Sequence, residues 1–364
     1  MSLRESSRRL LVPLALLIAS VLLTLAVVEI GLRVVAPSEN IAAVEHEPLR
    51  GWHGTVSASF TFEDDPVRIE VVHNSRGYRD LERTEENPDG AVRILCCGDS
   101  FTWGWGVEQD SIYTRLLEDA FREDSRLIEV MNVGICGQGT AQALVGLRDH
   151  GFDYRPAVVV YQAADNDIPG NLPLGGRGMW WKPYFVLEDD GALVLHDCPV
   201  PPLSFKEQVM HEAVRRSRLA HLLRSRLRAY LSQRAWRERA DRPPAPAPGV
   251  DYSFRLFCAL VNLMNEECAE HSAHLVVLID FSFSDERMEY WEERCGEVDA
   301  HFVFDYLIRR QEVRSTPAFI PGDGHWTTAG HRWIADYLYD VVLRDARAAG
   351  ETAAETARGA GPGS

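Results

Sequence analysis

The sequence has few of the patterns by which proteins bind metal ions, phosphates or nucleic acids. It contains no Cys-x-x-Cys and no His-x-x-x-His pair, so no metal site is predicted. No Lys-Ser or Lys-Thr follows the glycines after residue 98, which excludes a phosphate loop. Basic residues number 38 against 54 acidic ones, a formal net charge of −16. Such an acidic chain lacks the phosphate-neutralising charge of generic nucleic-acid binders. We therefore expect no metal, no cofactor and no nucleic-acid partner.

What the chain does contain is typical of a folded protein. Its 364 residues are 46% hydrophobic and 25% charged, which is enough to build the core of one or two domains. The seven cysteines are an odd number, so at least one of them is unpaired within the chain. The sequence alone does not say which of the others pair.

An uncharged, mostly apolar run extends from Leu10 to Val28. As a helix this run would be roughly 28 Å long, about the thickness of the hydrocarbon core of a bilayer. Arg4, Arg8 and Arg9 precede it, which places the amino terminus in the cytoplasm. We expect residues 1–30 to be a single-pass membrane anchor, with the rest of the chain on the extracytoplasmic side. A cleaved signal peptide and a buried helix of a soluble protein are the alternatives.

The remaining chain changes its pattern near residue 90. Residues 31–90 read as a connector and a β extension, with strands at 59–62 and 67–72 between turn-forming residues. In residues 91–345, apolar strands alternate with amphipathic helices, which predicts a three-layer α/β/α domain with a mainly parallel sheet. The expected strands are 93–97, 128–133, 157–162, 274–280 and 301–305, and the expected helices 112–121, 140–147 and 252–270.

The alternation is interrupted by an insertion at residues 169–250, which we expect to cap the edge of the sheet. Its part from 204 to 242 holds Lys206 and ten arginines against four acidic residues, a net charge of +7. Leucines recur there at helical spacing, which indicates an amphipathic helix that lies either on the body of the domain or on anionic lipid headgroups. Residues 346–364 are rich in Ala, Gly and Glu and are expected to be a disordered tail.

Four short polar motifs stand at the expected carboxyl ends of strands or just before the last helix. In an open α/β sheet the carboxyl ends of the strands form the binding edge. The motifs are Gly98-Asp99-Ser100-Phe101-Thr102, Asn132-Val133-Gly134-Ile135-Cys136-Gly137, Ala164-Asp165-Asn166-Asp167 and Asp323-Gly324-His325-Trp326.

In this order the motifs resemble blocks I, II, III and V of the SGNH (GDSL-type) hydrolase superfamily, over residues 92 to 343 apart from the insertion. The segment from Asn74 to Asp80 also resembles a stretch that precedes the domain in membrane-anchored bacterial members. The resemblance implies that Ser100 is the nucleophile, His325 its base and Asp323 the group that orients the histidine. It also implies an oxyanion hole made by the backbone N–H groups of Ser100 and Gly137 and the side-chain amide of Asn166.

These residue types suit the chemistry without the family name. A serine hydroxyl needs an imidazole to take its proton, and a carboxylate fixes the tautomer of that imidazole. The stretch around Ser100 lacks the second glycine of Gly-x-Ser-x-Gly, which argues against an α/β-hydrolase. Two departures from the family pattern are Ala164 in place of a glycine and an aspartate only two residues before His325.

We therefore expect a serine ester hydrolase acting through an acyl-Ser100 intermediate, on carbohydrate O-acetyl groups at the cell envelope. An O-acyltransferase that uses the same residues is one alternative. A catalytically silent glycan-binding protein of the same fold is another. The expected partners are an ester substrate and the membrane. Trp103 and Trp105 are expected either to line a substrate groove or to form a buried aromatic cluster.

Overall fold

The structure is a computed structural model that describes residues 3–35, 44–64, 67–124, 126–173, 181–220, 222–223 and 250–359. The chain divides into two compact units. One comprises Met1–Ile41 and Ser204–Ala245, and the other comprises Ala42–Leu203 and Pro246–Ser364. Each unit is described by itself.

The larger unit is built on a five-stranded sheet in which all neighbouring strands are parallel. The strand order is β11-β10-β7-β5-β6. The strands are β5 (Val92–Cys97), β6 (Ile128–Asn132), β7 (Val158–Ala163), β10 (His274–Ile279) and β11 (Asp299–Phe302). Apolar runs with both faces buried are typical of parallel sheets covered by helices. The predicted fold class is confirmed.

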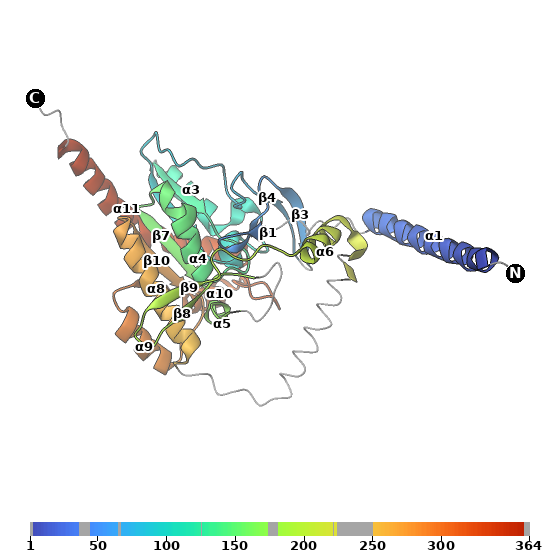
Figure 1. Ribbon diagram of the computed structural model, residues 1–364. Helices are drawn as coiled ribbons and strands as arrows, with labels where there is room; N and C mark the ends of the chain where they lie inside the picture. The colour runs from blue at the N-terminus through green and yellow to red at the C-terminus, as the bar shows by residue number, and fades with distance from the viewer. Residues whose placement is uncertain are drawn as a thin grey trace, which may run out of the picture. The chain divides into compact units, whose positions relative to one another are not determined.

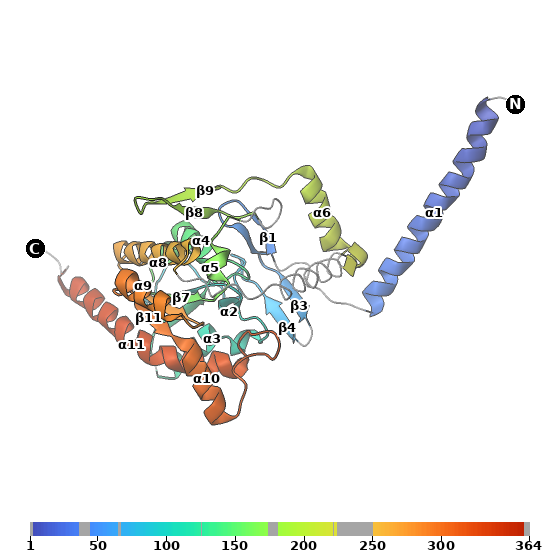
Figure 2. The same cartoon turned by 90° about the horizontal axis from the view of Figure 1, so that it is seen from below.

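Helices cover both faces of the sheet (Figures 1 and 2). Successive strand residues point to opposite faces, so Leu95 and Val159 belong to one buried cluster and Ile94 and Val158 to the other. The first cluster lies under α4 (Thr140–Gly146), α8 (Tyr252–Glu270) and α9 (Asp285–Cys295). The second lies under α3 (Tyr113–Glu123), α10 (Val303–Arg314) and α11 (Thr328–Gly359). Short helical turns complete this unit at α2 (Ser100–Trp103), Gln109–Ser111, Leu147–Gly151, Phe152–Tyr154 and α5 (Asp167–Gly170).

The segment ahead of β5 forms two antiparallel hairpins. They are β1 (Val44–Glu47) with β2 (Gly51–Gly54), and β3 (Ser59–Asp64) with β4 (Val67–Val72). The second hairpin covers the strands expected at 59–62 and 67–72. Val67, Ile69 and Val71 are buried while the alternate residues are exposed, and the buried face packs with Trp103. The extension is thus joined to the loop after Ser100.

Sequence analysis missed a hairpin inside the insertion, β8 (Tyr184–Leu187) with β9 (Leu193–His196). Its signal was present, because two short apolar runs flank a turn in which Gly191 has a φ of +89°. Phe185 fixes the hairpin in the core beside α8. Trp181 donates its indole N–H to Asp197 at 2.7 Å. The part of the basic leucine-containing segment from 224 to 242 lies outside the described residues.

Two further expectations need correction at the end of the sheet. The strand expected at 301–305 ends at Phe302, and α10 begins at Val303. Val303 and Leu307 are buried while Asp305 is exposed, which is helical spacing, because all three would share one face of a strand. The helices α9 and α10 were not predicted.

Helix α11 continues through Gly359, past residue 346 where a disordered tail was expected, because Ala, Glu and Arg are strong helix formers.

The smaller unit contains α1 (Leu3–Val35) and α6 (Phe205–Arg216). Residues Pro13–Val35 have a mean hydropathy of 2.5 and are not buried, so this helix is long and apolar enough to cross a membrane. A signal sequence shares these features. The Glu29 carboxylate accepts the Ser217 hydroxyl at 2.9 Å and the N–H groups of Arg218 and Leu219 at 2.9 and 3.0 Å. Residues 217–219, directly after α6, are therefore hydrogen-bonded to α1.

Candidate active site

The local geometry after β5 places Ser100 at the carboxyl edge of the sheet. Gly98 has a φ of +154°, and a Cβ there would lie 2.7 Å from the Thr102 hydroxyl and 2.9 Å from the Gln162 carbonyl oxygen. Only glycine fits this close approach. Asp99 caps α2 by accepting the Phe101 N–H at 2.9 Å, so Ser100 is the first residue of the helix and not its cap.

The structure brings Ser100, His325 and Asp323 into one hydrogen-bonded chain. Ser100 Oγ lies 2.7 Å from His325 Nε2, and His325 Nδ1 lies 2.5 Å from Asp323 Oδ1. The His325 backbone N–H also donates to Asp323 Oδ1 at 3.0 Å. The spacing of two residues between aspartate and histidine therefore suffices for contact. Partial burial raises the pKa of Asp323, but hydrogen bonds from His325 and Trp105 hold it below its usual value.

Trp105 contacts both partners of Ser100. Its ring stacks on the imidazole of His325 with centroids 5.2 Å apart, and its indole N–H donates to Asp323 Oδ2 at 3.2 Å. Trp103, by contrast, is buried beside Phe62. Trp103 thus belongs to the buried aromatic cluster. Trp105 packs on Phe62 of the same cluster and contacts His325 and Asp323, and it is not among the residues that line the cleft. Sequence analysis gave Trp105 no role toward Asp323.

The Asn166 side chain is held by a buried carboxylate. Its Nδ2 donates to Asp99 Oδ2 at 3.0 Å, and an amide NH₂ has a second hydrogen for another acceptor. Asp99 and Asp167 also hold loop backbone, since Asp99 accepts the Phe101 N–H and Asp167 accepts the Ala164 N–H at 2.8 Å. Burial raises the pKa of Asp99, and burial together with the nearby Asp99 raises that of Asp167 well above its usual value.

Gly137 occupies the loop after β6 with a φ of +73°, a conformation that favours glycine. The extension ahead of β5 supports this loop. Trp52 donates its indole N–H to the Cys136 carbonyl at 3.0 Å, and Gln138 Nε2 donates to the Trp52 carbonyl at 2.6 Å. Gly137 is not among the residues that line the cleft around Ser100.

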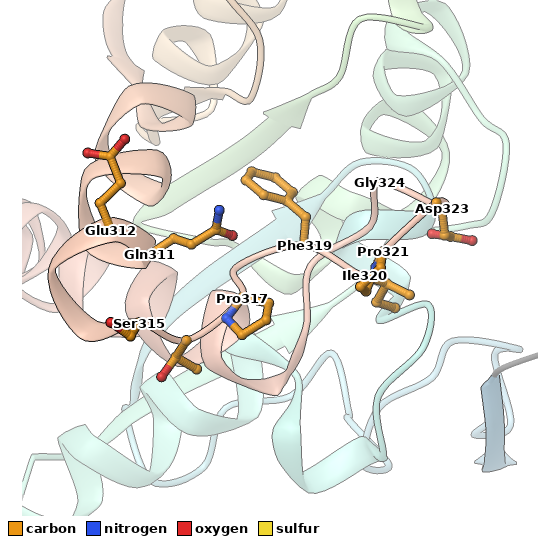
Figure 3. A pocket seen from close by; sticks show the side chains of 11 residues that line it. Gln311, Glu312, Ser315, Pro317, Phe319, Ile320, Pro321, Asp323 and Gly324 are labelled. Carbon is orange, nitrogen blue, oxygen red and sulfur yellow. The ribbon is translucent and has the colours of Figure 1, made fainter.

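Ser100, Asn166, Asp323 and His325 all line one cleft of about 1040 Å³. A neighbouring hollow of about 870 Å³ extends from α10 to Asp323, as Figure 3 shows. The two share Phe319, Asp323 and Gly324, so the loop that carries Asp323 forms a wall of both. A ligand in the cleft therefore meets Ser100 and His325 together.

Asp280 is a further polar residue of the cleft, at the carboxyl end of β10. Its Oδ2 accepts the indole N–H of Trp326 at 2.8 Å, and burial raises its pKa well above the usual value. Sequence analysis ended a strand at this residue without giving it a role. The signal was the same as for the other motifs, a polar residue directly after an apolar strand.

His331, the second histidine near the fourth motif, is buried and stacks on Tyr113. Its Nδ1 accepts the Tyr113 backbone N–H at 3.3 Å, and burial lowers its pKa to about 3. It therefore packs in the core and stays neutral. Within the described ranges, no group of three or more His, Cys, Asp or Glu side chains could hold a metal ion.

No family model matches the sequence, and no curated protein matches it. Among solved structures, the psychrotrophic esterase EstA from Pseudoalteromonas sp. is 13% identical, with 69% of this chain and 97% of that chain covered and a TM-score of 0.38. The lipase/acylhydrolase from Enterococcus faecalis is 11% identical, with 69% and 95% covered and a TM-score of 0.38. The acetyl xylan esterase AlAXEase is 11% identical, with 69% and 100% covered and a TM-score of 0.37.

The sequence motifs and the observed geometry agree in this unit. Each of the first three motifs follows a strand of the parallel sheet, and the fourth directly precedes α11. The resemblance to SGNH hydrolases implied a serine and a histidine in contact at this edge, and Ser100 and His325 are in contact there. Ser100, Asn166, Asp323 and His325 thus line one cleft of this unit, and the serine and the histidine are in contact as the resemblance implied.

Proposed function

We propose that this chain is a serine ester hydrolase in which Ser100 is the nucleophile, His325 the general base and Asp323 the residue that orients the histidine. The observation that carries the proposal is the 2.7 Å contact between Ser100 Oγ and His325 Nε2 inside the cleft. Because Asp323 accepts a hydrogen bond from His325 Nδ1–H, the other ring nitrogen, Nε2, carries no hydrogen and can accept the hydroxyl proton.

The reaction follows from this geometry. Ser100 Oγ bonds to the ester carbonyl carbon while its proton moves to His325 Nε2. The tetrahedral intermediate then breaks its bond to the alcohol oxygen, and the alcohol leaves with the proton from His325. Water attacks the acyl-Ser100 ester while His325 again takes a proton. The bond between the acyl carbon and Ser100 Oγ then breaks, Oγ takes the proton from His325, and the carboxylic acid leaves.

The negative charge on the carbonyl oxygen needs hydrogen-bond donors. We assign this role to the backbone N–H groups of Ser100 and Gly137 and to the side-chain amide of Asn166. Asn166 uses one hydrogen toward Asp99, which fixes the amide and leaves the other hydrogen for the oxyanion. Loss of one such donor typically costs about 2.7–4 kcal/mol of transition-state stabilisation.

The proposed setting is the cell envelope. Helix α1 is apolar enough to span a bilayer, and Arg4, Arg8 and Arg9 before its apolar part favour a cytoplasmic amino terminus. The domain of residues 91–345 would then act outside the cytoplasm, anchored by residues 1–30 through the segment 31–90. O-acetyl groups on envelope glycans are the proposed substrates at that location.

The test uses the full chain in detergent micelles, with p-nitrophenyl acetate hydrolysis and labelling by a fluorophosphonate as readouts. We expect Ser100→Ala to lose both, and His325→Ala to lose hydrolysis. His274→Gln is the matched control, because His274 also contacts an aspartate, Asp299 at 3.1 Å, but lies outside the cleft. It should keep wild-type activity. Equal activity in all variants would refute the assignment.

Two outcomes would favour the alternatives. Transfer of acetyl to an added oligosaccharide in preference to water would identify an acyltransferase that uses the same residues. A wild-type chain that neither hydrolyses the ester nor takes the label, yet binds the oligosaccharide, would be a silent glycan-binding protein.

A further inference from the structure

Among the polar side chains that line the cleft without a part in the proposed reaction, two have a buried polar atom with no hydrogen-bond partner in the described part of the chain. The first is Asp280, which is 7% exposed. Its Oδ2 is occupied by the Trp326 indole, and its backbone N–H donates to the Ala163 carbonyl at 3.0 Å. Its Oδ1 is buried and has no hydrogen-bond partner among the residues that the structure describes. This acceptor is fixed in place and unused.

The second is Arg287, in the first turn of α9. Its guanidinium lies over the Phe254 ring, 4.8 Å from the centroid, and its Nε is buried with no hydrogen-bond partner in the described part of the chain. Asp251, which also lines the cleft, uses its Oδ1 to accept the Phe254 N–H and the Ser253 hydroxyl. The Nε–H of Arg287 is therefore an unused donor.

The two residues are held by one short connection. Asp280 is the first residue after β10, and Ser284 caps α9 by accepting the Arg287 backbone N–H at 3.4 Å. Phe281 and Ser282, between them, line the same cleft. The connection from β10 to α9 therefore brings both side chains, each with one buried unpartnered polar atom, to the wall of one cleft.

Buried polar atoms without partners are costly, so a ligand that completes their hydrogen bonds is favoured. A hydroxyl group suits both atoms, because it can donate to Asp280 Oδ1 and accept from Arg287 Nε. An apolar alcohol satisfies neither atom. A carboxylate suits Arg287 alone and would meet the acidic side chains of Asp165 and Asp251 in the same cleft. Phe281, Phe304 and Phe319 supply apolar walls, the usual complement of a few orienting polar groups.

We infer that Asp280 and Arg287 form a subsite that binds hydroxyl groups of a polyhydroxylated alcohol, such as a sugar ring, whose acyl ester Ser100 attacks. The inference rests on the proposed function and names the residues that would bind the alcohol part of its substrate. Neither residue transfers a proton or forms a bond in the reaction. Both act by holding the alcohol part of the ester.

The test compares two acetates that differ in hydroxyl groups but share the acyl group and ring size. They are a mono-O-acetylated methyl glucopyranoside and cyclohexyl acetate, assayed on the full chain by acetate release. Asp280→Asn keeps an oxygen for the Trp326 indole and replaces the free oxygen by an amide donor. Arg287→Gln shortens the donor. Glu286→Gln, the exposed neighbour of Arg287 on α9, is the matched control.

For each of the two subsite variants we expect kcat/KM on the acetylated glucoside to fall about tenfold, which corresponds to one lost hydrogen bond. Hydrolysis of cyclohexyl acetate should stay within about twofold of wild type. The result that overturns the subsite is an equal change on both substrates, or no change on either, in variants with wild-type melting temperatures. A wild type that hydrolyses neither acetate and takes no fluorophosphonate label refutes the proposed function itself.

Discussion

Trp105 gives the sharpest test of how the site is held. Its indole N–H donates to Asp323 Oδ2, and its ring stacks on His325. Trp105→Phe removes the donor and keeps an aromatic ring, whereas Trp105→Ala removes both contacts. Trp105 does not line the cleft, so it acts on the substrate only through Asp323 and His325. We expect both variants to lower kcat while KM stays within about twofold.

The size of the effect follows from the two contacts. A hydrogen bond to a charged group contributes about 1.5–3 kcal/mol. The Asp323 side chain is 28% exposed, and solvent screening reduces this to about 1 kcal/mol. One kcal/mol is about a fivefold loss of kcat for Trp105→Phe. The stacked ring adds about 1 kcal/mol more, so Trp105→Ala should lose about thirtyfold.

The assay is p-nitrophenyl acetate hydrolysis with kcat and KM determined separately. Trp181→Phe is the matched control, because its indole also donates to an aspartate, Asp197 at 2.7 Å, but lies outside the cleft. It should leave kcat unchanged. If Trp105→Ala retains wild-type kcat, or if KM rises and kcat does not fall, the contact with Asp323 and His325 does not position the site.

Three further predictions follow from other contacts. Asp323→Asn removes the charge beside His325 Nδ1, and we expect kcat on p-nitrophenyl acetate to fall about a thousandfold, against no more than tenfold if Asp323 were only a turn residue. Arg79 is buried, and its guanidinium donates to the carbonyls of Gly104 and Val107 at 2.6 and 2.8 Å. Arg79→Lys should therefore lower the free energy of unfolding, measured in urea, by about 2–3 kcal/mol. An unchanged free energy would contradict a stabilising role of these two hydrogen bonds. Folding raises the pKa of the Asp167 carboxyl. The stability that this group contributes is therefore fully present below its unfolded pKa near 3.8, and it is lost as the pH rises through the pKa of the folded state. Asp167→Asn has no carboxyl to ionise and does not lose this stability, so the melting temperature of the variant minus that of wild type should rise between pH 5 and pH 8. If this difference in melting temperature stays constant, the pKa of Asp167 does not change on folding.

The sheet and the serine–histidine contact could be predicted because their signals are local. The strands β5 and β10 are followed directly by Gly98 and Asp280, and parallel strands bring their carboxyl ends to one edge. Ser100, Asn166 and His325 therefore meet although the chain separates them widely. Asp280 has the same local signal and could have been found in the same way.

Other features depend on tertiary packing that the sequence pattern does not record. Trp105 and Asp323 are 218 residues apart, and no pattern at either position indicates their hydrogen bond. The first residues of α10, 303–305, were read as the end of a strand, because Val303 and Phe304 suit either structure. The burial of Val303 and Leu307 on either side of the exposed Asp305 shows the helix. The hairpin β8–β9 was not predicted, because its two strands have only four residues each and the surrounding glycines and prolines indicated a loop.

Residues before β5 support the loops after β5 and β6, and this support limits how far the chain can be shortened. Trp52 holds the Cys136 carbonyl, and Arg79 holds the carbonyls of Gly104 and Val107. A recombinant fragment that starts at the first strand of the parallel sheet would omit both side chains and leave those carbonyls without these donors. A soluble form intended for crystallisation or screening should therefore begin ahead of Val44, where the hairpin that carries Trp52 starts.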